Sequence, residues 1–154
     1  MFFIRYYSIE SNKNAETLKK NFLGQHLKIH NLDFEIFEKG DTVKVIPHAE
    51  SDDQVYTLPI TRLRFVPKGS GTQIKMMSKP RRIDIGGPYL LMIFILFSII
   101  AAILLKLYGE GEYDRTAYII AGVAVIIFGA LWYRMEQGYF DYIRKVKNWV
   151  KEHA

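Results

Sequence analysis

Two long apolar segments near the C-terminus constrain this chain more than any other feature of its sequence. The first covers residues 88–108 and has no charged side chain before Lys106, and the second covers residues 117–134 and has none before Arg134. A helix needs roughly 20 apolar residues to cross a hydrocarbon core that is about 30 Å thick. Because lipid offers no partners for backbone N–H and C=O groups, both segments are predicted to be transmembrane helices. Residues 109–116 between them are expected to form a short external turn.

The charges beside the two segments predict an orientation in the membrane. The chain carries a formal net charge of +5, and its Lys and Arg residues concentrate before the first segment and after the second, whereas residues 109–116 are acidic. By the positive-inside rule, both termini are predicted to be cytoplasmic in a multi-pass protein of the cell inner membrane. Aromatic residues of the kind that favours the headgroup region stand near the segment ends: Tyr89, Tyr108, Tyr118, Trp132 and Tyr133.

Residues 1–85 are enough for one soluble domain with a single hydrophobic core. No signal peptide is predicted, because Arg5 interrupts the apolar N-terminus and no small-residue cleavage site follows it. The chain has no cysteine, which excludes disulfides and thiolate metal ligands and fits a reducing compartment.

The pattern of residues 1–85 predicts an α+β fold, a small antiparallel sheet with one packed helix. Alternating apolar residues separated by turn-forming residues predict strands and hairpins, and apolar residues at helical spacing followed by Gly24 predict the helix. The expected elements are a strand at 2–9, a helix at 13–23, a hairpin over 26–48 with its turn at 39–41, a short strand at 55–60 with Pro59 at an edge or a bulge, and a hairpin over 62–79.

The last hairpin is the best functional lead, because it alternates apolar and basic residues. Leu63 and Phe65 are predicted to face the core, while Arg62 and Arg64 face solvent. We expect this basic group to bind anionic lipid headgroups or an acidic partner protein. The alternative is that it only sets the topology and solvates an exposed sheet face. The residues concerned are Arg62, Arg64, Lys75, Lys79, Arg81 and Arg82.

Residues 138–154 are predicted to form a basic amphipathic helix. With Trp149 as an anchor, this helix is predicted to lie in the membrane interface. The alternative is that it continues the second transmembrane helix and packs on the soluble domain. The residues of this tail expected to bind lipid or a partner are Arg144, Lys145, Lys147 and Trp149.

Small residues in the second apolar segment predict a face on which another helix packs closely. That helix is either the first segment of the same hairpin or a helix of a partner or of a second copy. The residues concerned are Ala117, Ala121, Gly122, Ala124 and Gly129.

Candidate residues for catalysis or metal binding are sparse. His26 and His30 lie in a region predicted as a strand, where a spacing of four residues separates them by roughly 13 Å, so no metal site is predicted. The glycines in residues 67–72 and 85–88 lack the spacing of a phosphate-binding loop. The chain is therefore predicted not to be an enzyme, and neither a cofactor nor a nucleic-acid partner is expected.

These features predict an integral membrane accessory or scaffolding protein whose cytoplasmic domain binds a partner protein or anionic lipid headgroups. It is expected to work as a homo-oligomer or within a larger membrane complex. Two alternatives stay open. One is a subunit of an oligomeric channel or transporter, and the other is a membrane-surface enzyme that uses Asp84 or the histidines.

Overall fold

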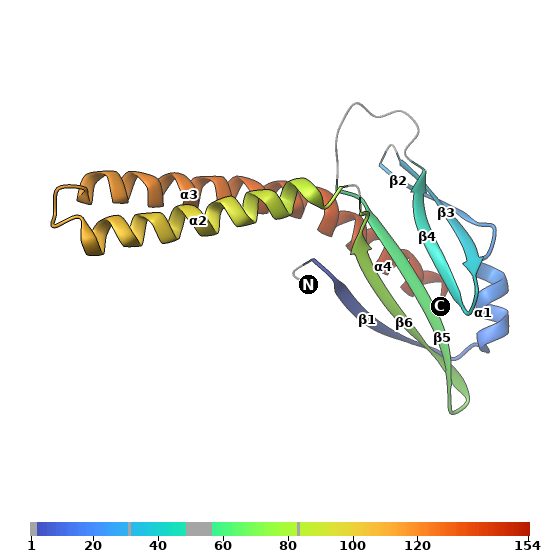
Figure 1. The fold of residues 1–154 in the computed structure, drawn as a ribbon. Coiled ribbons are helices and arrows are strands. Elements are labelled where there is room, and N and C mark those ends of the chain that lie inside the picture. The colour runs from blue at the N-terminus through green and yellow to red at the C-terminus, as the bar shows by residue number, and fades with distance from the viewer. Residues whose placement is uncertain (1–2, 31, 49–56, 83) are drawn as a thin grey trace. The chain divides into compact units, whose positions relative to one another are not determined.

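The computed structural model describes residues 3–30, 32–48, 57–82 and 84–154 (Figure 1). Its elements form two compact units. The first comprises Met1–Arg81 together with Gly138–Ala154, and we call it the sheet domain. The second is Arg82–Gln137, which we call the hairpin. The C-terminal tail therefore belongs to the same compact unit as the N-terminal region, although the hairpin separates them in the sequence.

The sheet domain contains one six-stranded sheet in which all neighbouring strands are antiparallel, with the order β1-β6-β5-β4-β3-β2. Strands β2 to β6 pair in sequence order as a meander, and the last of them, β6, also pairs with β1. The antiparallel α+β fold predicted from the sequence is thus confirmed. The strands are β1 (Arg5–Ser11), β2 (His26–Ile29), β3 (Leu32–Lys39), β4 (Thr42–His48), β5 (Pro59–Lys68) and β6 (Gly71–Pro80).

Both predicted hairpin turns are present, and each contains a glycine with positive φ, Gly40 at 60° and Gly69 at 59°. The region before Gly40 differs from the prediction, because β2 and β3 form a further hairpin that reverses at His30 (φ 54°). The assignment of His30 to a strand was therefore wrong. Pro59 is the first residue of β5 and lies beyond the stretch that pairs with β4, so its missing N–H costs no bond there.

Two helices pack on the inner face of the sheet: α1 (Ala15–Phe22), which was predicted, and α4 (Asp141–His153). The Asn14 side chain caps α1 by accepting a hydrogen bond from the Glu16 N–H. In Figure 1, α4 lies behind the strands. Apolar side chains from both helices and the sheet fill the interior: Leu18, Phe22, Phe34, Leu63, Ile74, Met76, Ile143, Val146 and Val150.

The prediction that the tail lies in the membrane interface was wrong for its apolar side, which is buried in the sheet domain. The Trp149 ring meets Phe22 edge-on at 5.1 Å between centroids. The Tyr139 hydroxyl donates a hydrogen bond to the backbone oxygen of Phe3 at 2.7 Å. The sequence pattern could not separate the two outcomes, because an amphipathic helix presents the same apolar face to lipid as to a protein core.

The hairpin consists of α2 (Gly86–Tyr108) and α3 (Asp114–Met135), and both are long and apolar enough to cross a membrane. Ile95 and Ala102 of α2 are buried, as are Ala117 and Ala124 of α3, while most other large apolar side chains of the hairpin are exposed. A helical segment with π-type hydrogen bonding, η1 (Glu136–Phe140), joins α3 to α4. The backbone is therefore helical from Asp114 to His153.

Candidate functional site

The outer face of the sheet, opposite α1 and α4, is built by the alternation of side chains along its strands. Leu63 and Met76 point inward and are buried, so their strand neighbours point outward. The strand register then sets Tyr6, Met77 and Arg62 in one row across β1, β6 and β5. Lys44 of β4 continues this row beside Arg62. The next row, roughly 7 Å along the strands, contains Ser8, Lys75 and Arg64.

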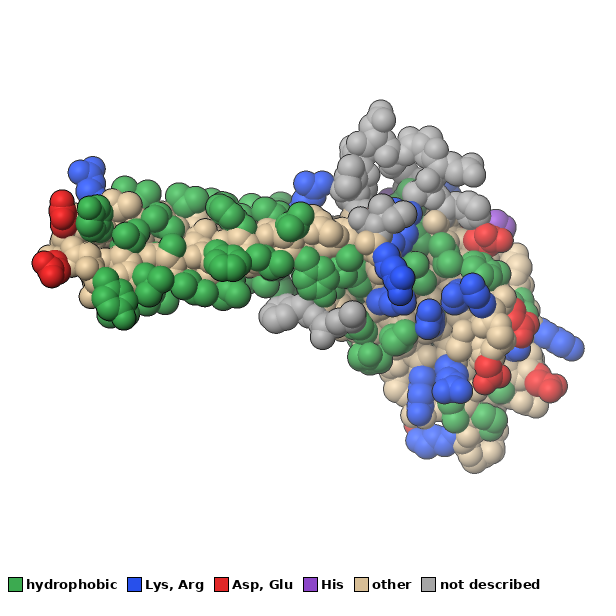
Figure 2. Space-filling model, in the orientation of Figure 1, with side chains coloured by type: hydrophobic (Ala, Val, Ile, Leu, Met, Phe, Trp, Pro, Cys, Tyr) green, Lys and Arg blue, Asp and Glu red, His purple; other side chains and the backbone are tan. Residues whose placement is uncertain are grey.

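Lys and Arg side chains gather on this outer face, as Figure 2 shows. Lys68 of β5 pairs there with Glu10 of β1 at 2.7 Å. Five further cations lie on the outer side of β4, β5 and β6. We call this surface the basic face. Among these five, Arg64 is the one with an ion pair to a described residue, Asp41 at 3.6 Å, and both side chains are mostly exposed. Within the described part of the chain, the other four cations have no carboxylate partner. The basic face consists of Lys44, Arg62, Arg64, Lys75 and Lys79.

Desolvation and neighbouring positive charges both act on the Lys44 ammonium. Desolvation lowers the pKa of the Lys44 ammonium, and the charges of Lys39, Arg62 and Lys79 lower it further. Each of these effects disfavours a positive charge. An anion that bound here would relieve the repulsion, so the electrostatics of this face suit a negatively charged ligand.

An open hollow of about 630 Å³ lies on the basic face. Arg62 lines it, and the Nε of this side chain is shielded from solvent and has no hydrogen-bond partner in the described structure. The described lining contains no histidine or carboxylate. The hollow is lined by Tyr6, Tyr7, Ser8, Thr42, Arg62, Arg64, Gln73, Lys75, Met76 and Met77.

The structure brings together four of the six hairpin cations singled out in the sequence: Arg62, Arg64, Lys75 and Lys79. It adds Lys44 and Tyr6, which the sequence reading missed because they lie in other strands. The available signal was their own alternation, since Lys44 stands between the buried Val43 and Val45. Which strands pair, however, is not encoded in that alternation.

The remaining two cations of the predicted group lie at the boundary between the two units. The Arg81 backbone N–H donates to the Leu58 carbonyl at 3.1 Å, so this residue continues the pairing of the sheet domain. Arg82 is exposed and belongs to the hairpin.

The tail residues predicted to bind lipid lie on α4, away from the basic face. Arg144 and Lys145 both pair with Asp141, at 3.7 Å and 3.1 Å. The Lys147 ammonium lies over the Tyr7 ring at 4.7 Å. Trp149 packs on Phe22. These four residues therefore make contacts within the sheet domain.

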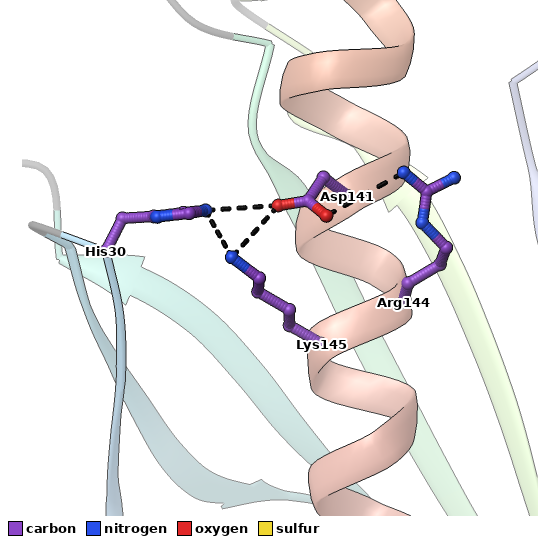
Figure 3. A network of polar contacts seen from close by, with 4 residues as sticks. All are labelled: His30, Asp141, Arg144 and Lys145. Atoms are coloured by element: carbon purple, nitrogen blue, oxygen red, sulfur yellow. Dashed lines mark hydrogen bonds and ion pairs between the residues drawn. The ribbon is translucent and has the colours of Figure 1, made fainter.

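A second polar cluster joins the start of α4 to the β2–β3 turn (Figure 3). The His30 Nε2 lies 3.0 Å from the Asp141 Oδ2, and the Lys145 ammonium contacts both. Burial alone would raise the pKa of Asp141, but hydrogen bonds from His30 and Lys145 outweigh it and lower that pKa below its ordinary value. The cluster is thus an ionic link between two segments distant in sequence.

The two histidines considered as metal ligands make separate contacts. His26 pairs with Asp33 at 3.0 Å, whereas His30 pairs with Asp141. Across the described ranges, no group of three or more His, Asp or Glu residues is placed to hold a metal ion. The side chain of His48 lies outside the described structure, and His153 stacks on Trp149.

The small residues of α3 fall on two faces. Ala117 and Ala124 are buried in the hairpin, and Ala121 is half-buried. Gly122 and Gly129 are exposed, with open space where a Cβ would stand. The first group fits packing within the hairpin, and the second leaves a face of α3 uncovered.

No protein-family model, no curated protein and no solved structure matches this chain.

Proposed function

We propose that this chain is an integral membrane accessory or scaffolding protein, anchored by the α2–α3 hairpin, whose sheet domain binds an anionic partner on the basic face. The partner is an acidic protein segment or the headgroups of anionic lipids. One observation carries this proposal: Lys44, Arg62, Lys75 and Lys79 are gathered on one sheet face without a carboxylate partner in the described structure. Gathered like charges cost stability, and a partner of opposite charge offsets that cost.

The way the chain enters and leaves the hairpin supports a role at a membrane surface. Only residues 81–85 separate β6 from α2, and the segment after α3 enters the core of the sheet domain through Tyr139. Both ends of the hairpin are thus joined to the sheet domain by short segments. In the proposed topology, both termini are cytoplasmic and the α2–α3 turn faces the other side of the membrane.

Two cysteine substitutions test this topology in a chain that has no cysteine of its own. Ser70 is exposed in the β5–β6 turn and Glu112 is exposed in the α2–α3 turn. An impermeant thiol reagent applied to intact cells is expected to label Glu112→Cys and to leave Ser70→Cys unlabelled until the cells are opened. Labelling of Ser70→Cys alone in intact cells would reverse the orientation.

A photo-reactive amino acid placed in the hollow tests the binding role in the native membrane. Position 73 lines the hollow, and Lys28, exposed on β2, provides the matched control. Irradiation is expected to give an adduct from position 73, with a protein-sized shift for a protein partner or a lipid mass for a headgroup. No adduct above that of position 28 would overturn the proposal.

The uncovered face of α3 favours a second candidate, a subunit of an oligomeric channel or transporter. Gly122 and Gly129 are open to close approach by another helix, and two helices alone cannot enclose a pore. Native mass spectrometry in mild detergent separates the candidates. A discrete ring of copies would favour the channel, a stable foreign partner would favour the accessory role, and a monomer with no partner would contradict both.

A further inference from the structure

We propose that the hollow on the basic face is a binding site for a phosphomonoester whose organic part packs on Tyr6 and Met77. This inference rests on the proposed function and names the class of ligand that the basic face selects. The hollow of about 630 Å³ falls in the range of roughly 300–1,000 Å³ that is usual for small-molecule sites. It is therefore large enough for an organic anion and larger than a bare ion needs.

The charge of the hollow matches a phosphomonoester better than a singly charged anion. Arg62, Arg64 and Lys75 all line it, and the described carboxylate that pairs with one of them, Asp41, makes only an exposed contact of 3.6 Å with Arg64. A phosphomonoester carries close to two negative charges at pH 7, because its second pKa is about 6. It also offers three oxygens, which accept the forked hydrogen bonds of guanidinium groups.

Arg62 combines a buried unpaired nitrogen with a neighbouring positive charge. Its Nε is sequestered without a hydrogen-bond partner, and its neighbours in the row are Met77 on one side and another cation, Lys44, on the other. A polar atom shielded from water and left unpaired costs free energy. Because this Nε has no exposed surface, a ligand in the hollow can meet only the outer N–H groups of the guanidinium, and its negative charge would offset the repulsion between Arg62 and Lys44.

Tyr6 and Met77 give the hollow an apolar wall beside its cations. Their positions pair directly across β1 and β6, and the Tyr6 side chain is 69% exposed. An exposed aromatic ring beside a cation binds a ligand with an apolar body and a charged end. Inorganic phosphate would leave this wall unused. The organic part could belong to a soluble compound or to a phosphatidic acid in the membrane.

Isothermal titration of the full chain in phosphatidylcholine nanodiscs tests the site, with empty nanodiscs as the blank. The probes are phenyl phosphate, dihexanoyl phosphatidic acid and inorganic phosphate. We expect both organic phosphates to bind about tenfold more tightly than inorganic phosphate, because burying a ring or acyl chain adds over 1 kcal/mol. The tighter of the two organic probes identifies a soluble or a lipid source.

Matched variants distinguish binding in the hollow from attraction by the net positive charge of the domain. Arg62→Gln/Arg64→Gln is expected to weaken phenyl phosphate binding roughly tenfold or more, since each guanidinium donates charge-assisted bonds. Lys20→Gln/Lys28→Gln removes the same charge from exposed positions elsewhere and is expected to have little effect. Arg62→Lys keeps the positive charge but loses the planar guanidinium that donates two parallel hydrogen bonds. It is therefore expected to weaken binding while leaving the fold intact.

Tyr6→Ser provides a second, independent readout. It is expected to abolish the advantage of the organic probes and to leave the binding of inorganic phosphate unchanged. Equal losses in the two double variants, or equal affinity of wild-type protein for all three probes, would overturn the phosphomonoester site but leave a general anion-binding face. A missing photo-adduct at position 73 would instead overturn the proposed function, so the two failures are distinguishable.

Discussion

Asp141 shows how a single side chain links the start of α4 to the rest of the sheet domain. Its pKa is held below the ordinary value of about 3.9, so the ionised carboxylate stabilises the folded state at neutral pH, and this stabilisation is lost as the pH falls through the lowered pKa. We expect Asp141→Asn to lower the free energy of unfolding by about 1 kcal/mol at pH 7. The difference should shrink as the pH falls through the lowered pKa of Asp141. Urea unfolding followed by Trp149 fluorescence, in a Trp132→Phe background, measures it.

The His26–Asp33 pair provides the control for this prediction. Its distance is also 3.0 Å, but both side chains are about half exposed and both belong to the β2–β3 hairpin. An exposed pair contributes roughly 0–1 kcal/mol. Asp33→Asn should therefore change stability less than Asp141→Asn. Equal losses would show that the contact with α4 adds nothing to an ordinary surface pair.

The Lys44 pKa reports directly on the field of the basic face. Because desolvation and then the charges of Lys39, Arg62 and Lys79 lower it, Arg62→Gln should raise the Lys44 pKa toward the ordinary lysine value. Lys28→Gln, on β2, should leave it unchanged. Titration of ¹⁵N-labelled lysine side chains by NMR checks both. An unchanged pKa in Arg62→Gln would mean that the cations of this face do not act on one another.

The pairing of β1 with β6 depends on a glycine at the start of β6. A Cβ on Gly71 would stand 2.3 Å from the backbone oxygen of Ser11, so Gly71→Ala must push the end of β1 away. We expect a loss of about 2 kcal/mol in unfolding free energy, the usual effect of overpacking. Gly69→Asn is the matched change in the same turn, because it meets open space and Asn tolerates positive φ. A loss in Gly69→Asn as large as in Gly71→Ala would contradict this explanation.

The packing within the hairpin gives a similar contrast between two small residues of α3. Ala124 is buried, whereas Gly122 faces open space. Ala124→Leu should lower the free energy of unfolding of the hairpin in nanodiscs by about 1–3 kcal/mol, because the larger side chain forces α2 and α3 apart. Gly122→Leu should leave the hairpin stable. If the chain forms oligomers through the open face, native mass spectrometry would show their loss in Gly122→Leu.

Local signals in the sequence predicted α1, the two glycine turns and the inward and outward alternation of β5 and β6. They missed the β2–β3 turn, because His30 occupies a positive-φ position where glycine or asparagine is the usual signal. They also predicted only part of the basic face. Arg62 and Lys75 lie in one hairpin and were found together, but Lys44 joins them through strand pairing, which depends on the whole sheet.

The placement of α4 has the largest consequence for the chain as one unit, because it makes the sheet domain discontinuous. Its core is completed by a helix that follows the hairpin in the sequence. Tyr142, Ile143, Val146 and Val150 are each at least nine-tenths buried. Burial of such a side chain is worth roughly 1.5–3 kcal/mol, so the helix contributes about as much as the whole stability of a small domain, about 5–15 kcal/mol.

This discontinuity predicts which fragments of the chain can fold. Residues 1–81 alone should remain unfolded, because Phe22 and Phe34 would lose the helix that covers them. A chain in which a flexible Gly-Ser linker replaces residues 82–137 should fold as a soluble domain, since both of its segments belong to one compact unit. Dispersion of amide signals in an NMR spectrum distinguishes the two outcomes. Folding of residues 1–81 with the stability of the linked chain would mean that α4 is dispensable. In that case α4 would pack on a domain that residues 1–81 fold by themselves, and it would add little to the free energy of unfolding.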